Sequence, residues 1–310
     1  MPTLVSIVSP CFNEEENVDE LYRRVIAATS KLDNYQFEFI FIDNASTDGT
    51  VAKLKKLSTE DRRVKIIVNT RNFGHIRSPY YGIMQSSGAA TVYLASDLQD
   101  PPELIPEFVR AWEEGYKVVM AVKPASLGHA LTHAVRRLYY RSLDGISDVT
   151  LLSDSTGFGL YDRVVLDQIR QINDPYPYFR GLISELGYKI KTIQFIQPRR
   201  MRGITKNNFY TLYDTAMLGM VSHSKVPIRI VAFFGFVLGF LSTLAGIVFL
   251  ILKLMFWYYF PVGIAPIAIA VCFLFGVQLF FTGIIGEYIA SIHTYVQKKP
   301  VVVEKERINF

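Results

Sequence analysis

The stretch YLASDLQDPPEL, residues 93–104, joins the end of an apolar run to a cluster of acids and prolines. The apolar residues stop before Asp97, a second carboxylate follows at Asp100, and two prolines close the segment. A turn at the end of a buried strand would explain the prolines, which favour turns. It leaves the two carboxylates and the amide of Gln99 unexplained, and these side chains indicate a polar site at the end of the strand.

Short apolar runs alternate with helical patterns through the first 125 residues. The runs predict strands at 5–9, 37–42, 64–68, 91–95 and 118–122. Between the first two runs, Val18, Leu21 and Val25 recur at helical spacing, and Asn13 is placed to cap that helix. A second helical pattern follows Asp48. Strands that alternate with helices predict an α/β fold with a doubly wound, mostly parallel sheet.

Polar clusters follow four of these predicted strands. They are SPCFNEEEN (9–17), DNASTDGT (43–50), NTRNFGH (69–75) and SDLQDPP (96–102). In open α/β sheets the ligand crevice lies at the carboxyl ends of the strands. Four successive strands that end in such clusters therefore predict one shared site at this edge rather than four separate turns.

The signatures of two common nucleotide-binding folds are missing from the sequence. It has no G-x-G-x-x-G after the first strand and no G-x-x-x-x-G-K-[ST], which argues against a dinucleotide-dependent dehydrogenase and a P-loop NTPase. A site of carboxylates and amides at the sheet edge remains. Such groups can hold the hydroxyls of a nucleotide and can bind Mg²⁺ or Mn²⁺ through oxygen.

Half of the residues are hydrophobic and the mean hydropathy is +0.21, with the excess near the C-terminal end. No charged residue occurs in the 23 positions between Arg229 and Lys253 or in the 33 between Lys253 and Glu287. Since about 20 apolar residues cross a bilayer as a helix, these stretches predict two transmembrane helices with a short loop near 253–263. Buried core helices are the alternative, but charge-free runs of this length are rare in soluble cores.

The distribution of Lys and Arg predicts that both termini face the cytoplasm. Lys225 and Arg229 precede the first predicted span and Lys298 and Lys299 follow the second, whereas the loop between them carries only Lys253. The first residues lack the basic segment of a secretory signal, so we expect the N-terminal domain to stay cytoplasmic. The two cysteines lie far apart in the sequence, which argues against a disulfide framework and fits a reducing compartment.

These patterns divide the chain into four segments. We expect a cytoplasmic α/β domain at 1–206, a juxtamembrane helix at 207–228, the two spans at 229–286 and a cytoplasmic tail at 287–310. The apolar stripe in 207–224 predicts a helix that lies in the membrane interface, although packing on the domain core would produce the same stripe. An exposed interfacial helix could also support association into a homo-oligomer.

The net charge of +5 is concentrated in two basic stretches. Five basic residues and no acid occur from Lys117 to Arg141, and six basic residues and no acid from Lys189 to Lys206. Nucleic acid binds such stretches in other proteins, but beside a membrane anchor an anionic lipid or a phosphorylated substrate fits better. We therefore expect no nucleic-acid partner.

Five stretches together resemble family 2 glycosyltransferases of the GT-A fold. They are SIVSPCFNEEENV (6–18), FIDNASTDGT (41–50), RNFGH (71–75), SDLQDPPELIPEF (96–108) and GEYIASIHTYVQKKP (286–300). With the two apolar stretches, their order is similar to that of the polyprenyl-phosphate glycosyltransferases, the relatives of dolichol-phosphate mannose synthase and of bactoprenol glucosyltransferases. The resemblance implies a Rossmann-like GT-A catalytic domain that is anchored in the lipid bilayer of the bacterial inner membrane.

The resemblance also implies the residues that bind the nucleotide sugar. Pro10, Asn13, Glu14 and Asp43 match the nucleotide pocket of the family, where Asp43 would contact the uridine or the ribose. Asp97 matches a residue that is shared between this pocket and the metal motif.

In the metal motif, Asp97 and Gln99 match the positions that hold Mg²⁺ or Mn²⁺ on the diphosphate. A sugar nucleotide leaves as a nucleoside diphosphate, so the metal neutralises the charge that develops there. Many relatives carry D-x-D, whereas this chain has Ala95 at the first position. Either Asp100 or water would then complete the ion's ligands.

A second departure and two basic clusters concern the acceptor side of the site. Relatives commonly carry an acid where this chain has Gly157, so a catalytic role is implied for that position, together with Arg202. The acceptor phosphate would be bound by Arg136, Arg137, Arg200, Arg202 and Lys206. A phosphate monoester has a second pKa near 6. It therefore needs positioning more than deprotonation, and we expect reduced rather than absent activity.

The resemblance implies transfer of one sugar, with inversion, from a nucleotide sugar to undecaprenyl or another polyprenyl phosphate. Glucose from UDP-glucose is the donor sugar suggested by the subgroup. A processive polysaccharide synthase is an alternative, but QPRRM (197–201) lacks the tryptophan of the Q-x-x-R-W element of those enzymes. A non-catalytic scaffold that binds nucleotide or lipid is another alternative, which Ala95 and Gly157 keep open.

Overall fold

An eight-stranded sheet forms the centre of the computed structural model, which describes residues 2–123, 155–172, 174, 177–198, 226–256, 264–297 and 299–310. The strand order is β7-β5-β6-β4-β1-β2-β3-β8. The strands are β1 (Thr3–Cys11), β2 (Tyr35–Asp43), β3 (Val64–Asn69), β4 (Ala90–Tyr93), β5 (Val118–Val122), β6 (Ser155–Asp162), β7 (Ile190–Gln194) and β8 (Glu304–Ile308). The five strands expected from the first 125 residues are confirmed.

The sheet is mostly parallel, as the alternation of strands and helices predicted. β1 pairs in parallel with β2 and β4, β2 with β3, and β5 with β7. β6 runs antiparallel to β4 and β5, and β8 runs antiparallel to β3. The carboxyl ends of β1, β2 and β4 therefore meet at one edge, where the polar clusters follow them.

Helices cover both faces of the sheet. They are α1 (Val18–Thr29), α2 (Thr50–Glu60), α3 (Gly74–Met84), the 3₁₀ turn η1 (Pro102–Leu104), α4 (Ile105–Glu113), α6 (Arg163–Ile172) and α7 (Phe179–Glu185). Side chains of α1, α2 and α4 pack in one core cluster, and those of α3, α6 and α7 pack in the other. Successive residues of β2 enter different clusters, Phe39 the first and Ile40 the second, because strand side chains alternate between faces.

The prediction that Asn13 caps the first helix is wrong. α1 begins at Val18 with Asn17 at the N-cap position, four residues later than the sequence pattern suggested. Asn13 instead has φ 56°, and its Oδ1 accepts a hydrogen bond of 2.9 Å from the backbone N–H of Thr47. The residues between β1 and α1 thus form a loop that is bound to the loop after β2.

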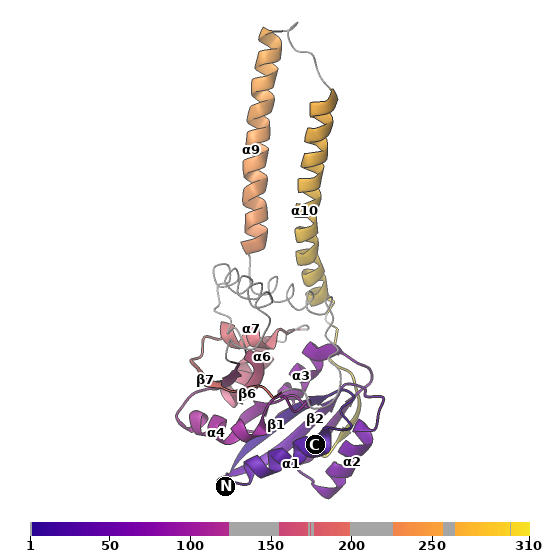
Figure 1. Cartoon of the computed structure of the whole chain (residues 1–310), viewed down its shortest axis with the longest axis vertical. Helices are drawn as coiled ribbons and strands as arrows, with labels where there is room; N and C mark the ends of the chain where they lie inside the picture. Colours follow the sequence, from indigo (N-terminus) through magenta and orange to yellow (C-terminus); the bar gives the residue numbers. More distant parts are fainter. Residues whose placement is uncertain are drawn as a thin grey trace.

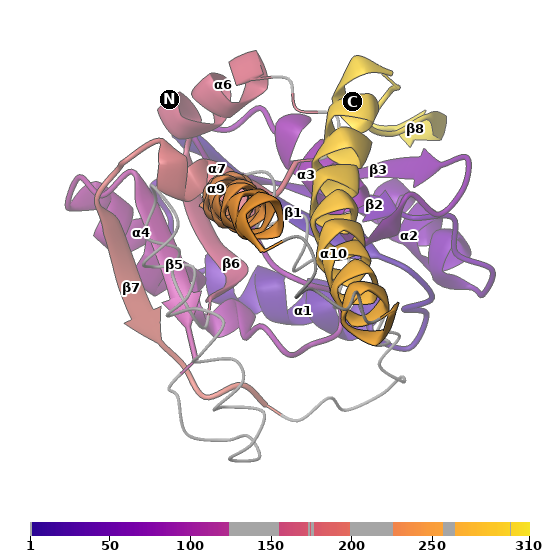
Figure 2. The same ribbon diagram turned by 90° about the horizontal axis from the view of Figure 1, so that it is seen from above.

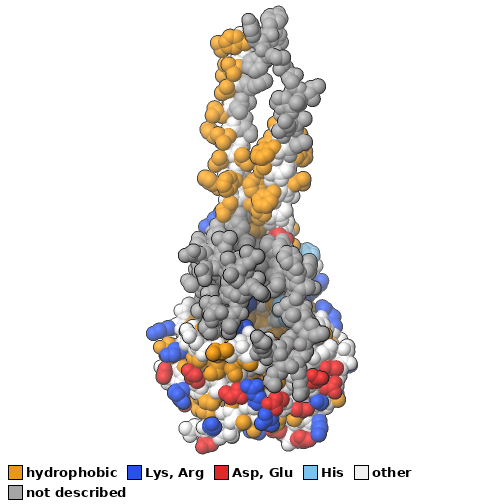
Figure 3. Space-filling view, in the orientation of Figure 1, with side chains coloured by type: hydrophobic (Ala, Val, Ile, Leu, Met, Phe, Trp, Pro, Cys, Tyr) orange, Lys and Arg blue, Asp and Glu red, His pale blue; other side chains and the backbone are white. Residues whose placement is uncertain are grey.

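Two long helices extend from the domain, α9 (Val226–Met255) and α10 (Ile264–Val296) (Figure 1). Their described side chains are mostly apolar and uncovered: Phe236 is 81% and Phe240 is 70% exposed. Figure 3 shows hydrophobic side chains along both helices and charged ones on the domain below. Within the described ranges, Phe273–Val296 is long and apolar enough to cross a membrane by length and composition, and Ile228–Leu241 is apolar but shorter.

The segment 287–310, which we expected to form a tail, contains the end of a helix and a strand of the sheet. α10 continues unbroken past Glu287 to Val296, and residues 304–308 form β8 on the edge of β3. The pairing was not predicted because β8 reads EKERI, a polar strand without apolar alternation. An edge strand needs partners for its unpaired N–H and C=O groups, which β8 supplies for β3.

The face of the sheet that carries α3, α6 and α7 is turned toward α9 and α10 (Figure 1). The view from above shows α9 over α7 and β6, and α10 beside it (Figure 2). At the domain end of α10, the hydroxyl of Tyr295 donates a hydrogen bond of 3.0 Å to Oδ2 of the buried Asp174. α10 is therefore attached to the domain both through this contact and through β8.

Candidate active site

The carboxyl ends of β1, β2 and β4 are joined by short side-chain contacts. Oγ of Ser96, just after β4, lies 2.7 Å from Oγ of Ser9 and 3.0 Å from Sγ of Cys11 on β1. Cys11 is in turn the register partner of Asp43 at the end of β2. These contacts bring the YLASDLQDPPEL loop, the end of β1 at Pro10 and Asp43 to one edge of the sheet, as the sequence predicted.

The loops after β1 and β2 are connected by a ladder of hydrogen bonds. The N–H of Asn13 donates to Oγ of Ser46 and the N–H of Glu14 donates to Oγ1 of Thr50, each at 2.9 Å. The N–H of Gly49 donates to Oε2 of Glu15, also at 2.9 Å. Asn13 and Glu14 are thus positioned beside Asp43, and their backbone groups are fixed by the neighbouring loop.

Asp43 is fully buried, and its two carboxylate oxygens are in different situations. Oδ2 accepts a hydrogen bond of 2.9 Å from the N–H of Ser46, whereas Oδ1 has no hydrogen-bond partner among the described residues. Burial raises the pKa of this carboxyl above its ordinary value, against the lowering effect of its bonds to Ser46 and Ala45. An unmatched acceptor in a buried position is costly, so a donor group from a ligand would stabilise it.

Backbone strain is concentrated in the same three loops. Asn13, Ala45 and Leu98 have φ of 56°, 62° and 59°, which is the left-handed region that non-glycine residues rarely adopt. They follow β1, β2 and β4 respectively. Such conformations cluster at ligand sites, where the surrounding hydrogen bonds maintain them. Only one other non-glycine residue in the described ranges, Asn309, has positive φ.

Asp97 and Asp100 have different roles in the loop after β4. Oδ2 of the buried Asp100 accepts a hydrogen bond of 3.1 Å from the N–H of Ala95 and so caps the end of the strand. Asp97 is half-buried, and its Oδ1 accepts from the N–H of Gln99 at 3.2 Å. Both acids thus accept a hydrogen bond from the backbone of the loop, and Asp100 is the more buried of the two.

No group of three or more His, Cys, Asp or Glu in the described part of the chain could hold a metal ion by itself. The oxygen donors of Asp97 and Gln99 nevertheless match the preference of Mg²⁺, which is commonly bound by one or two carboxylates plus substrate phosphates and water. The side chains present thus fit an ion that takes most of its ligands from a diphosphate, and not an ion held by the protein alone.

Gly157 lies on β6, next to the end of β4. The last printed pair of the two strands joins Tyr93 to Gly159. Gly157 therefore lies close to the end of β4 that leads into the acidic loop. Gly157 has φ +88°, and an added Cβ would meet only the Tyr93 ring, at 3.7 Å. A side chain has room here, although the backbone conformation favours glycine.

A cavity of about 300 Å³ adjoins Gly157. Its walls come from α3, β4, β6 and α7, and its lining residues are His75, Ile76, Pro79, Tyr80, Ile83, Tyr93, Gly157, Pro177, Tyr178, Phe179 and Arg180. His75 and Arg180 are its cationic or protonatable nitrogen groups. His75 ends one of the polar clusters that the sequence predicts at this edge. Arg180 was not predicted, because its helix is distant in sequence and carries no motif.

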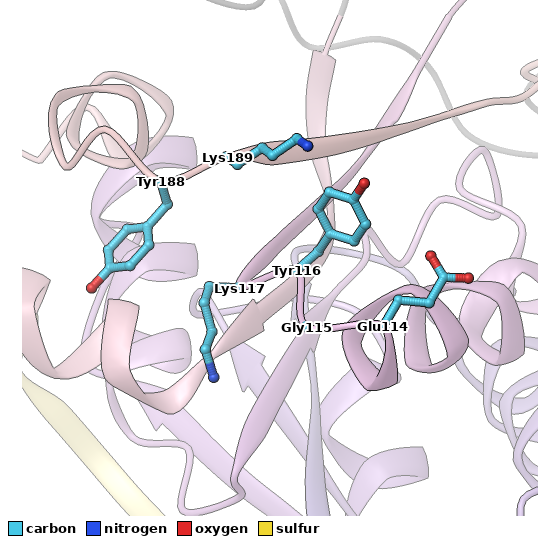
Figure 4. A pocket seen from close by; sticks show the side chains of 6 residues that line it. All are labelled: Glu114, Gly115, Tyr116, Lys117, Tyr188 and Lys189. Carbon is cyan, nitrogen blue, oxygen red and sulfur yellow. The ribbon is translucent and has the colours of Figure 1, made fainter.

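A second hollow of about 420 Å³ lies away from this edge, at the amino ends of β5 and β7 (Figure 4). Its two lysines already have partners: Lys117 is paired with Asp162 at 2.9 Å, and the ammonium group of Lys189 lies over the Tyr116 ring at 5.5 Å. These contacts explain the local charge without a ligand.

The predicted acceptor-phosphate residues Arg136, Arg137, Arg200, Arg202 and Lys206 lie outside the described residues, as does the segment 207–224. One contact reaches the start of the second basic cluster. Nε2 of Gln99 lies 3.5 Å from the carbonyl oxygen of Pro198, at the limit of a hydrogen bond. The acidic loop and the residue preceding Arg199 are therefore adjacent.

Comparison with known proteins agrees with this geometry. The family model described as "Glycosyl transferase family 2" matches residues 6–170, which include β1, β2, β4 and β6. An uncharacterised glycosyltransferase of Synechocystis is 32% identical over 298 residues, covering 96% of this chain and 93% of its own. A prophage-derived bactoprenol glucosyl transferase of Shigella flexneri is 30% identical over 304 residues, covering 97% of each chain.

Among solved structures, a mannosyltransferase of Pyrobaculum calidifontis with GDP-mannose and Mn²⁺ is 13% identical, with a TM-score of 0.49, over 96% of this chain and 88% of its own. The assignment to a family does not use this structural likeness. It rests on the family model and on the two relatives, whose similarity extends over nearly the whole chain. With the sheet-edge site that the motifs form, they establish that this chain is a glycosyltransferase and belongs to glycosyltransferase family 2.

Proposed function

We propose that the protein transfers one sugar from a nucleotide sugar to a polyprenyl phosphate. Glucose from UDP-glucose is the proposed donor sugar and undecaprenyl phosphate the proposed acceptor, with inversion at the anomeric carbon. The observation that carries this proposal is the position of the site. The buried Oδ1 of Asp43, which has no described hydrogen-bond partner, lies at the edge of the sheet where a nucleotide could bind, and the chain that forms this domain continues into two long apolar helices. Full-length similarity to a bactoprenol glucosyl transferase supports the acceptor class.

On the donor side, Asp43 would accept a hydrogen bond from the uracil N–H or a ribose hydroxyl. Its Oδ1 is buried and unmatched, so a ligand N–H or O–H there would remove a desolvation cost of about 1–3 kcal/mol. Pro10, Asn13 and Glu14 would line the same pocket. The pairing of Pro10 with Ile42, and the hydrogen bonds of Asn13 and Glu14 to the loop after β2, support this proposal.

Asp97 and Gln99 would hold Mg²⁺ or Mn²⁺ on the diphosphate. When bound, the ion would neutralise the charge that develops on the leaving nucleoside diphosphate. The chain itself contributes the position of Asp97, which Asp100 stabilises by capping the preceding strand end. Because one protein carboxylate is available where many relatives offer two, we propose that the ion binds mainly through the substrate's phosphates.

On the acceptor side, Arg136, Arg137, Arg200, Arg202 and Lys206 remain the proposed phosphate-binding residues of the two basic clusters. The contact of Gln99 with Pro198 supports the second cluster, because it brings the residue before Arg199 to the acidic loop. Because position 157 is a glycine, the acceptor phosphate would meet no carboxylate of the protein there. A phosphate dianion requires no general base, so the loss would affect orientation rather than proton transfer.

We propose that α9 and α10 both cross the inner membrane of a bacterium, with the domain and both termini in the cytoplasm. Two observations support this: the described apolar side chains of both helices are largely exposed, and basic residues flank the predicted spans. The acceptor phosphate would then lie at the cytoplasmic surface, where polyprenyl phosphates present their headgroup. We propose the segment 207–224 as the surface through which a homo-oligomer would form.

The test is to incubate the purified full-length protein with undecaprenyl phosphate, Mg²⁺ and each of several UDP- and GDP-sugars. We expect a lipid-linked monosaccharide from UDP-glucose, identified by mass spectrometry, with its anomeric configuration determined by NMR. A water-soluble polymer would instead indicate a processive synthase. No product with any donor, while nucleotide or lipid still binds, would indicate the scaffold.

A further inference from the structure

The cavity beside Gly157 lies across Tyr93 from the acidic loop. The Tyr93 ring faces Gly157 and lines the cavity, while its strand leads directly into Asp97 and Asp100. Burial and these two carboxylates raise the pKa of the Tyr93 hydroxyl, and Arg180 opposes them, so the tyrosine lies between charges of opposite sign. One side of Tyr93 is thus suited to a metal ion, and the other to an anion.

The charge of the cavity is unusual for this edge of the sheet. Among the described residues that line it there is no carboxylate: the ionisable groups are Arg180, His75 and three tyrosines, which are neutral at physiological pH. An acid at position 157 would add a negative charge to this wall, which the glycine avoids. Arg180 is half-buried, which strengthens its attraction for an anion compared with a fully exposed arginine.

The remaining lining of the cavity is apolar and aromatic. Ile76, Pro79, Ile83 and Phe179 form these walls, together with the ring of the buried Tyr80. A volume of about 300 Å³ exceeds that of a phosphate group and is at the lower end of small-molecule sites. A cation next to apolar walls is suited to a ligand with a phosphate at one end and a hydrocarbon at the other.

The chemistry of an inverting transfer also bears on where the acceptor would bind. In an inverting transfer, a phosphate oxygen forms a bond to the anomeric carbon while the bond to the diphosphate breaks, and the electron pair leaves with the nucleoside diphosphate. A dianionic acceptor supplies the attacking oxygen without losing a proton. The acceptor must approach from the side opposite the leaving group. With the diphosphate at Asp97, the acceptor's phosphate would then lie across the sugar, and the cavity on the Gly157 side of Tyr93 is available for it.

We propose that this cavity binds the phosphate and first isoprene unit of the acceptor, with Arg180 as the principal phosphate ligand and His75 as a second one. The proposal rests on the proposed function, and it adds a described subsite to the basic clusters. The cavity lies on the face of the sheet that is turned toward α9 and α10, from which a membrane-bound acceptor would enter (Figure 1).

The first test measures the Michaelis constants of both substrates with farnesyl phosphate as a soluble acceptor. For Arg180→Ala we expect the acceptor KM to rise about tenfold or more, because one hydrogen bond to a charged group is lost. The donor KM should not change. Arg180→Lys should recover part of the loss, because it keeps the charge but not the fork. Arg23→Ala, which removes an exposed arginine paired with Glu20 on α1, is the matched control.

An increase in the donor KM alone would overturn the proposal, because it would assign the cavity to the transferred sugar. An unchanged acceptor KM in Arg180→Ala would overturn it as well. Thermal unfolding of each variant separates these results from misfolding, and partial rescue by Arg180→Lys provides a second control, since a merely structural defect would not appear in one KM only.

The second test measures equilibrium binding without turnover, so it remains valid if no donor sugar is used and the proposed function fails. Wild-type protein is titrated with farnesyl phosphate, farnesol and inorganic phosphate. We expect farnesyl phosphate to bind most tightly, and Arg180→Ala to weaken it about tenfold while leaving farnesol unaffected. Tightest binding of inorganic phosphate would indicate a simple anion site, and equal binding of farnesyl phosphate by both proteins would exclude Arg180. Either result contradicts the proposal.

Discussion

The hydroxyl of Tyr161 donates a hydrogen bond of 2.6 Å to the carbonyl oxygen of Gly157. Both residues are on β6, and the bond fixes the backbone of Gly157 at the rim of the cavity, where φ is +88°. Tyr161 is fully buried, and burial raises the pKa of its hydroxyl, so the donor proton is retained. The conformation of residue 157 is therefore held by its surroundings and would persist when the side chain is changed.

Gly157→Asp and Gly157→Asn form a pair that separates charge from backbone strain. Both side chains tolerate positive φ and fit beside Tyr93. Because a phosphate dianion needs no general base, we expect kcat of the Asp variant to exceed that of the Asn variant by less than about tenfold. The new carboxylate should also raise the acceptor KM relative to Asn. Absent wild-type turnover that Gly157→Asp restores would show that the acid is essential.

Asp43 should make donor binding sensitive to pH. Its pKa is raised by burial, and protonation removes the acceptor that a uracil N–H or ribose hydroxyl needs. We expect the donor KM to rise as the pH falls, beginning at a higher pH than an ordinary aspartate would require. Asp43→Asn should have a high donor KM without this pH dependence, whereas the exposed Asp33→Asn should resemble wild type. A pH-independent wild-type KM would contradict the assignment.

Divalent metal should be required for turnover, and Asp97 should determine its affinity. We expect a chelator to abolish product formation and added Mg²⁺ or Mn²⁺ to restore it. Asp97→Asn should raise the Mg²⁺ concentration at half-maximal rate by about tenfold or more, because it removes the charge of the one carboxylate proposed to hold the ion. Full activity in the chelator would exclude this role.

Glu38 should contribute strongly to the stability of the sheet. It is buried and bonded to Ser6, to Lys65 at 2.6 Å and to the N–H of Ser87 at 2.9 Å. Burial alone would raise the pKa of Glu38, but these bonds outweigh it and lower the pKa. We expect Glu38→Gln to destabilise the protein by about 3 kcal/mol, since it leaves Lys65 unpaired.

The sign of the pH dependence follows from the lowered pKa of Glu38. Its contribution is fully present above the ordinary glutamate pKa of 4.5 and is lost as the pH falls through the lower pKa of the folded state. Thermal unfolding of wild type and Glu38→Gln should therefore converge in acid. The control is Glu60→Gln, whose exposed pair with Lys56 should contribute little at any pH.

The C-terminal strand should stabilise the domain through Asn309. Its Nδ2 donates hydrogen bonds of 2.9 Å to the carbonyl oxygens of Ser58 and Val64, and its φ of 61° suits asparagine. We expect Asn309→Ala to lower the free energy of unfolding by about 1–3 kcal/mol, measured by thermal unfolding. Lys305→Ala, an exposed change on β8, should have no effect. Equal stability of Asn309→Ala and wild type would show that β8 is not a firm part of the sheet.

Local patterns in the sequence were sufficient for much of the fold. The apolar runs predicted the first five strands, because buried parallel strands need continuous apolar residues. The polar clusters predicted the shared edge, since parallel strands present their carboxyl ends together. Asn13 was misassigned as a helix cap, because its partner Thr47 lies on a loop that folds beside it only in the tertiary structure.

The sequence by itself determined the alternation of strands and helices, the two apolar stretches and the acids at the end of β4, all of which depend on nearby residues. Only the tertiary structure decided that Asp100 caps a strand, that EKERI closes the edge of β3, and that Arg180 faces the same cavity as Gly157. These relationships join residues far apart in the chain. Their energies come from burial and hydrogen bonds that exist only after the sheet has formed, so no local pattern records them.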